Sequence, residues 1–197
     1  MRSSAALLGF LLVPFLATAP AHAGEGVFGV FFDPAGTNCS GSVPVASYAP
    51  LHVVLLPQGS TFGGIMGAEF SVTAAQNSTF LLQGESVESG AIQIGAALNG
   101  GATIGFANCH AGSAIPVLSF QAVNLGGSAS DVEVRVAAKS SPSNPLLQCP
   151  LAVLCDEPQF TAICVSGTRG ILNPSGDAPC GAGRRSASWE HVKDMYR

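Results

Sequence analysis

The feature that most constrains this chain is a series of short apolar runs whose residues alternate in polarity and which are separated by turn residues. The clearest run is Asp131–Val136, where three valines alternate with Asp131, Glu133 and Arg135. Alternation with a period of two places the valines on one face of a strand and the charges on the other. This pattern predicts a half-buried antiparallel strand.

Eight further segments have the same character, and helical periodicity is absent between them. The predicted strands are 27–32, 48–56, 65–74, 80–82, 92–98, 102–107, 114–123, 131–136 and 160–165. The chain also has 24 glycines and 13 prolines, which suit many turns. About nine short strands of this spacing predict an all-β, antiparallel β-sandwich, either a jelly roll or an immunoglobulin- or cohesin-like fold.

Two segments make more specific predictions. In 48–56 both faces are apolar, since Leu51 and Val53 alternate with His52 and Val54, and this predicts a strand in the middle of a sheet. Between 92–98 and 102–107, Asn99-Gly100-Gly101 predicts a β-hairpin with a type I′ turn, because both central residues of that turn need positive φ.

The first 23 residues are typical of a cleavable export signal. An apolar run from Ala5 to Ala17 follows a short basic start, and Ala21-His22-Ala23 gives the small-x-small pattern that precedes cleavage. The run is shorter than the roughly 20 residues of a membrane span. We therefore expect a secreted chain that begins at Gly24, has no membrane span, and is extracellular, periplasmic or held at the cell surface.

Six cysteines all follow the export signal, and their even number favours disulfides in an oxidising compartment. Zinc is a poor alternative because no C-x-x-C pair occurs. We predict the bridges Cys149–Cys155 and Cys164–Cys180, which close short loops, and Cys39–Cys109, which ties the start of the domain to its middle.

The last residues differ from the rest. Residues 24–183 are expected to form the disulfide-bearing sandwich, and 184–197 a short amphipathic helical tail with Ser188 as N-cap. Trp189, Val192 and Tyr196 recur at helical spacing and are the candidate partner-docking residues. The tail either covers an open edge of the sandwich or docks on a partner by its apolar face, as in tail-mediated assembly.

Signatures of chemistry are weak in this sequence. It has no Walker lysine or nucleophile elbow, and we expect no catalytic, cofactor-binding or metal residues. The net charge of −4 and the lack of a basic patch argue against nucleic acid as a partner. Calcium at loop tips stays open as an alternative, although no D-x-D-x-D-G loop occurs. A polysaccharide hydrolase is the second hypothesis, with Glu69 as its first carboxylate.

Between about residues 48 and 124 the order of features resembles the cohesin-like family of β-sandwiches. Leu51-His52-Val53-Val54-Leu55-Leu56 is followed by a loop and then by Ile65-Met66-Gly67-Ala68-Glu69-Phe70-Ser71-Val72. A small-residue hairpin and Ile115-Pro116-Val117-Leu118-Ser119-Phe120 come later. The resemblance covers less than half of the chain. It implies an immunoglobulin-like sandwich that binds a protein or a surface rather than an enzyme, with an unidentified protein or glycan as partner.

The chain departs from that family in its six cysteines and its tail. The stretch Cys149–Asp156 and the ending from Trp189 to Arg197 resemble those of secreted proteins from environmental bacteria, a likeness that implies no activity. The sequence therefore favours a secreted, non-catalytic binding or structural module.

Overall fold

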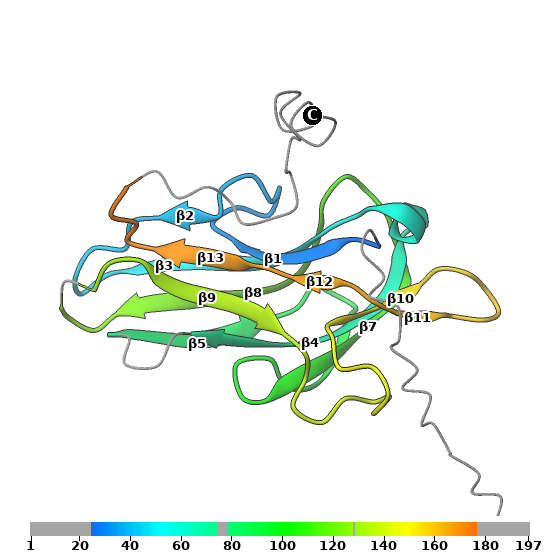
Figure 1. The fold of residues 1–197 in the computed structure, drawn as a ribbon. Helices are drawn as coiled ribbons and strands as arrows, with labels where there is room; N and C mark the ends of the chain where they lie inside the picture. Colours follow the sequence, from blue (N-terminus) through cyan, green and yellow to red (C-terminus); the bar gives the residue numbers. More distant parts are fainter. Residues whose placement is uncertain (1–24, 75–78, 128, 177–197) are drawn as a thin grey trace, which may run out of the picture.

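The computed structural model describes residues 25–74, 79–127 and 129–176. These residues form two β-sheets that pack face to face (Figure 1). The first sheet has the strand order β12-β1-β3-β8-β5. Its strands are β1 (Val27–Phe31), β3 (Tyr48–Leu56), β5 (Phe80–Ser86), β8 (Ile115–Asn124) and β12 (Ser166–Gly167).

The second sheet follows the order β11-β10-β4-β9-β13-β2, and β7 pairs with both β4 and β6. Its strands are β2 (Ser40–Gly41), β4 (Ile65–Ala74), β6 (Ile92–Ala96), β7 (Gly101–His110), β9 (Val132–Ala137), β10 (Leu151–Leu154), β11 (Ala162–Cys164) and β13 (Arg169–Leu172). A single 3-10 turn, η1 (Gly59–Gly63), joins β3 to β4. Pairing is antiparallel except for β1–β12 and β2–β13, which are parallel.

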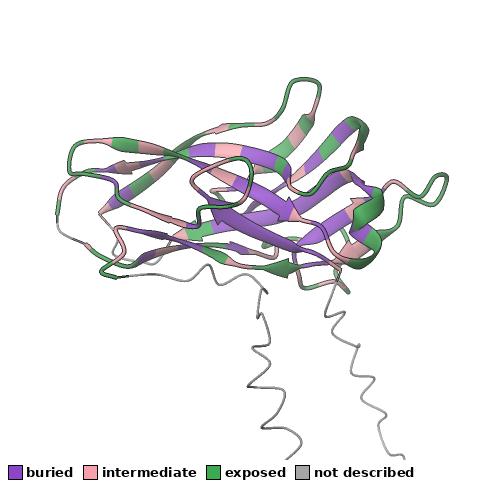
Figure 2. Ribbon diagram, turned by 90° about the horizontal axis from the view of Figure 1, so that it is seen from above, coloured by how far each residue is buried: buried purple, intermediate pink, exposed green. Residues whose placement is uncertain are grey.

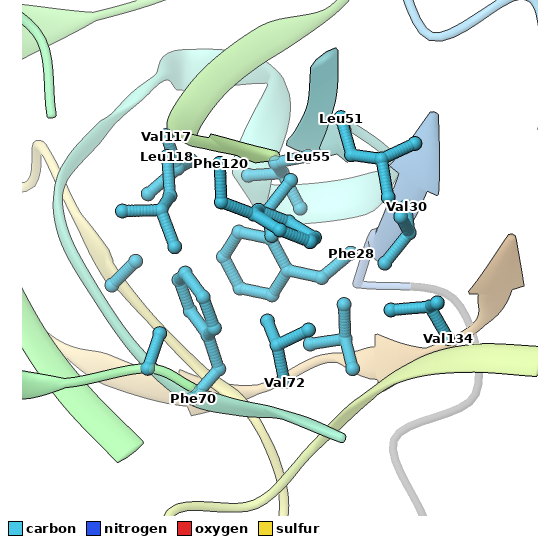
Figure 3. Packing of buried hydrophobic residues seen from close by; sticks show 14 of the residues in the cluster. Phe28, Val30, Leu51, Leu55, Phe70, Val72, Val117, Leu118, Phe120 and Val134 are labelled. Carbon is cyan, nitrogen blue, oxygen red and sulfur yellow. The ribbon is translucent and has the colours of Figure 1, made fainter. Parts of the chain in front are cut away.

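The core lies between the sheets and is built from the alternating apolar positions of the long strands. Phe28 of β1 and Phe70 of β4 come from opposite sheets, and their ring centroids are 5.4 Å apart (Figure 3). Phe120, Leu51 and Val134 surround this pair and are buried. Figure 2 shows that buried residues gather on the strands, whereas the loops are largely exposed. The predicted sandwich is confirmed.

The two strand-level predictions from alternation are also confirmed. In β9 the three valines are buried and Arg135 is exposed. β3 lies between β1 and β8, and its second face is buried at Val54, which packs with Phe31 and Cys39 in a separate small cluster. The loop after β1 covers this outer face, which explains why β3 is apolar on both sides.

The described part of the chain has thirteen strands, more than the nine predicted. The additional ones are short: β2, β10, β12 and β13 have two to four residues each. Strands of this length carry too few alternating residues to be recognised. They form because longer neighbours such as β1, β4 and β9 supply backbone partners.

The predicted hairpin between β6 and β7 is present, but its predicted type I′ turn is wrong. Ala96 pairs with Gly101, so the loop has four residues, and Asn99 N donates to Ala96 O. Positive φ falls on Gly100 (84°) and Gly101 (121°), not on Asn99. The extra residues let Ala97 O accept a hydrogen bond from Val72 N of β4, which fixes the loop against the next strand.

All three predicted disulfides are wrong. The structure pairs Cys109 with Cys155 and Cys149 with Cys164, and Cys39 is bonded to neither Cys109 nor Cys155. Cys149 and Cys155 flank β10, and six residues of extended chain separate their Cα atoms by about 20 Å, well beyond the reach of a disulfide. Short sequence separation therefore misled the prediction.

Strand register explains the observed bridges. Leu151 lies opposite Cys164 in the β10–β11 pair, which brings Cys149 close to Cys164. His110 and Leu154 both lie opposite Ile65, the first residue of β4, so Cys109 and Cys155 meet there. Cys39 is itself disulfide-bonded. Cys180 and the predicted helical tail, with Trp189, Val192 and Tyr196, lie outside the described residues.

Truncation of Phe70 to alanine should remove the aromatic contact of β4 with Phe28 of the opposite sheet. We expect the free energy of unfolding to fall by about 3–5 kcal/mol, as for other buried Phe→Ala changes. The free energy of unfolding is measured by urea denaturation monitored by circular dichroism. Leu146→Ala is the control, because Leu146 is 87% exposed and should cost little. Equal losses in the two variants would contradict the assigned core.

The two described disulfides should differ in their contribution to stability. Cys109–Cys155 spans 46 residues and Cys149–Cys164 spans 15. In the chain-entropy treatment, the longer loop constrains the unfolded chain more, by about 1 kcal/mol. We expect C109S/C155S to lower the free energy of unfolding by about that much more than C149S/C164S in the same denaturation assay. A larger loss in C149S/C164S would contradict the assignment.

Candidate functional site

Glu69, the carboxylate expected to lead a hydrolase site, lies on the outer face of β4 and is only 3% exposed. Its Oε1 accepts a hydrogen bond of 2.8 Å from Ser143 N, and its Oε2 accepts bonds from the hydroxyls of Ser143 and Thr103. Lys139 Nζ is 3.5 Å from Oε2. The segment after β9 thus folds over β4 and covers the carboxylate.

The electrostatics of Glu69 agree with a structural role. Burial acts to raise its pKa, but the hydrogen bonds from Ser143 and Thr103, together with the Lys139 charge, outweigh burial and hold the pKa below its ordinary value. A glycosidase acid needs a raised pKa and a second carboxylate across the substrate. No second carboxylate is among the described partners of Glu69, so the geometry does not support the hydrolase hypothesis.

Glu85 of β5 has a comparable role at the other side of the sandwich. Its two oxygens accept hydrogen bonds from Ala97 N (2.9 Å) and Leu98 N (2.7 Å), and Gln93 Nε2 also donates to it. These donors belong to β6 and the β6–β7 turn. Glu85 therefore links β5, at the edge of the first sheet, to the β6–β7 hairpin of the second sheet. Nothing in the sequence pattern pointed to this role.

The histidines show a partial convergence that the sequence did not predict. His52 of β3 and His110 of β7 line one open hollow of about 340 Å³, together with Ser86, Glu88 and Ser119. His110 Nδ1 is 3.2 Å from Glu88 Oε2. Ser119 Oγ donates to Ser86 O, so its hydrogen is not directed to an imidazole. The hollow therefore lacks the hydrogen-bonded nucleophile and base of a catalytic triad.

Burial lowers the pKa of His52, and the Asp33 charge offsets only part of that effect. His52 is consequently neutral at pH 7.

The loop-tip carboxylates considered for calcium accept hydrogen bonds from backbone N–H groups of loops. Asp33 accepts hydrogen bonds from Thr37 N and Asn38 N, and Asp156 accepts one from Thr161 N. Asp131 accepts one from Ser175 N. Within residues 25–74, 79–127 and 129–176, no three His, Cys, Asp or Glu side chains are grouped so that they could hold a metal ion.

One sheet face carries exposed apolar side chains beside an open glycine, Gly105. Ile92 and Ile94 of β6 point outward and are 69% and 68% exposed. Ile92 begins a row of paired residues that crosses four strands. It lies opposite Gly105 of β7, Gly105 pairs with Gly67 of β4, and Gly67 pairs with Val153 of β10. A Cβ added to Gly105 would have no atom within 4 Å. We call this surface, formed by Ile92, Ile94, Gly105, Gly67 and Val153, the isoleucine face.

The isoleucine face is a shallow apolar surface with a glycine floor. Gly67 is buried at the inner end of this surface, whereas Gly105, Ile92 and Ile94 are exposed among the described residues. Adjacent exposed apolar side chains, such as Ile92 and Ile94 among the described residues, are typical of protein-binding surfaces. The sequence marked 92–98 as a strand but could not indicate that its apolar residues face outward.

Solved structures share this fold. One similar structure is the sixth cohesin of scaffoldin B from Acetivibrio cellulolyticus, solved in complex with a Cel5 dockerin mutant. The two sequences are 13% identical and the TM-score is 0.50. The match covers 76% of this chain and 99% of that one. A cohesin module of a family 33 glycoside hydrolase from Clostridium perfringens has 9% identity and a TM-score of 0.49, covering 77% of this chain and 98% of that one.

The chain therefore has a cohesin-like β-sandwich fold, as the resemblance in its sequence implied. No family model and no curated protein matches the chain. Among the described residues, no helix is long and apolar enough to cross a membrane.

Neutralising Glu69 should make the fold less stable and less sensitive to acid. In Glu69→Gln the charge-assisted hydrogen bonds are lost, and we expect a loss of about 1–3 kcal/mol at pH 7. Because folding lowers the pKa of Glu69, its stabilising effect is complete above the unfolded pKa and disappears as the pH falls through the folded pKa. The difference between wild type and variant should therefore shrink below about pH 4.

Urea midpoints between pH 2.5 and 7 measure this difference. Glu157→Gln is the matched control, since Glu157 is exposed and should change little. A constant difference between wild type and Glu69→Gln across the whole pH range would show that the carboxylate charge is not what matters.

Proposed function

We propose that this chain is a secreted, non-catalytic β-sandwich module that binds a protein partner through its isoleucine face. The observation that carries the proposal is the pair Ile92 and Ile94, both about two-thirds exposed, with Ile92 lying opposite the open Gly105 of β7. The cohesin with the same fold was solved with a dockerin, which is a protein partner. That likeness supports a binding role for the sandwich.

The shape of the isoleucine face indicates the chemistry of the partner. Two β-branched side chains standing beside glycines offer a ridge and a trough, into which an apolar side chain of the partner could pack. The charges of the second sheet are paired with one another: Arg135 and Arg169 with Glu133, and Lys139 with the buried Glu69. The partner surface is therefore expected to be mainly apolar, with little dependence of binding on salt.

A secreted location is part of the same proposal. It rests on the export signal before Gly24 and on the disulfides, which persist in oxidising compartments. The fold supports a binding module rather than the hydrolase alternative, because Glu69 is enclosed by its own hydrogen-bond donors.

Charge introduced on the isoleucine face should abolish partner binding without unfolding the protein. We expect Ile92→Asp/Ile94→Asp to reduce capture of the partner at least tenfold, because two carboxylates would have to be desolvated in the interface. The measurement is quantitative mass spectrometry of proteins retained from the native extracellular fraction. A purified dockerin serves as a defined second probe.

The matched control is Val45→Asp/Leu125→Asp. Val45 and Leu125 are 60% and 69% exposed and lie away from β6. Proteins captured by wild type and by this control, but not by the isoleucine variant, support the proposal. Identical capture by all three proteins would refute the isoleucine face as the binding surface.

A further inference from the structure

The outer face of the first sheet carries a second, chemically different surface. Register places side chains from β3, β8 and β5 in three parallel rows on this face. The first row is Tyr48, Val123 and Leu81, the second is Pro50, Gln121 and Gln83, and the third is His52, Ser119 and Ser86. We call the six positions Tyr48, Pro50, Gln83, Gln121, His52 and Ser119 the amide strip.

The amide strip is accessible and rich in uncharged hydrogen-bonding groups. Tyr48 is 65% exposed, and Gln83 and Gln121 are both exposed. Within the described ranges, neither glutamine side chain has a hydrogen-bond partner that would occupy its amide. Two free amides on adjacent strands can each donate and accept hydrogen bonds toward one ligand.

The strip runs into the hollow of about 340 Å³ that His52, Ser119, Ser86, Glu88 and His110 line. The rows of one strand are about 6.7 Å apart, so the strip extends about 13 Å from Tyr48 to His52 before it reaches the hollow. An elongated surface with a terminal hollow suits an extended chain of repeating polar units better than a compact molecule.

Charge decides which kind of chain fits. The cations of the described residues are Arg135, Lys139 and Arg169, which lie on β9, just after it, and on β13. None of them belongs to the first sheet, and His52 is neutral at pH 7 because burial lowers its pKa. A polyanion would find no counter-charge on the strip, whereas hydroxyl groups pair well with amides, hydroxyls and a neutral imidazole.

We propose that the amide strip binds a neutral polysaccharide, with Tyr48 offering an apolar ring surface to a sugar ring and Gln83 and Gln121 hydrogen-bonding to hydroxyl groups. This function goes beyond the proposed protein-binding role and uses the opposite sheet. A module with both surfaces would hold its protein partner on a polysaccharide.

The test is retention of the disulfide-bonded protein on amorphous cellulose, insoluble chitin and a mixed-linkage β-glucan, with alginate as an anionic comparison. We expect wild type to bind at least one of the three neutral polymers and not alginate. Gln83→Ala/Gln121→Ala and Tyr48→Ala should each weaken that binding at least tenfold. Gln148→Ala/Gln159→Ala is the matched control, since both of these glutamines are exposed outside the strip.

The urea midpoint of each variant shows that the fold is retained, because the exchanged side chains are on the surface. Absence of binding to all three neutral polymers would overturn the proposal, as would binding that survives in Gln83→Ala/Gln121→Ala or binding to alginate alone. Ile92→Asp/Ile94→Asp should retain polysaccharide binding in full. Loss of protein capture with polysaccharide binding intact, or the reverse, separates the two functions.

Discussion

The arrangement of the sandwich depends on the burial of β4 from Gly67 to Val72. From Ile65 to Glu69 its backbone pairs with β7 along one edge and with β10 along the other. From Ser71 to Ala74 it pairs with β9. On its inner face Phe70 meets Phe28 of the opposite sheet. On its outer face Glu69 would be a buried, unpaired charge without Ser143, Thr103 and Lys139, so the segment after β9 must fold over it. Core, sheet order and loop path thus all depend on one strand.

The outer faces of the two sheets leave different side chains exposed. In the row next to Glu69, Gly67 is buried, whereas Gly105 and the apolar Ile92 are exposed among the described residues. On the other sheet, loop residues pack over Val54 but leave Gln83 and Gln121 in solvent. The two exposed faces differ in chemistry, one apolar and one rich in amides, and this difference underlies the assignment of a protein partner to one and a polysaccharide to the other.

Much of the fold could be predicted because alternation depends on local sequence. The runs at 48–56, 65–74 and 131–136 were placed within a residue or so, the buried valines of β9 were assigned correctly, and β3 was correctly expected to be apolar on both faces. The candidate site was less predictable. Glu69 was identified as an unusual carboxylate, but whether it faces a cleft or its own loop depends on Ser143, which is 74 residues away in sequence. The convergence of His52 and His110 is equally non-local.

The sequence by itself determined the class of fold: alternating apolar runs and turn residues specify a β-sandwich with a cohesin-like order of features, and its six cysteines favour disulfides. Only the tertiary structure decided which cysteines meet, which carboxylates are structural, and which apolar residues remain exposed. The physical reason is that period and turn chemistry act between neighbours along the chain. Disulfide partners, hydrogen-bond donors and covering loops are instead supplied by strand register, which brings Cys109 to Cys155 and Gly67 to Val153 across long separations.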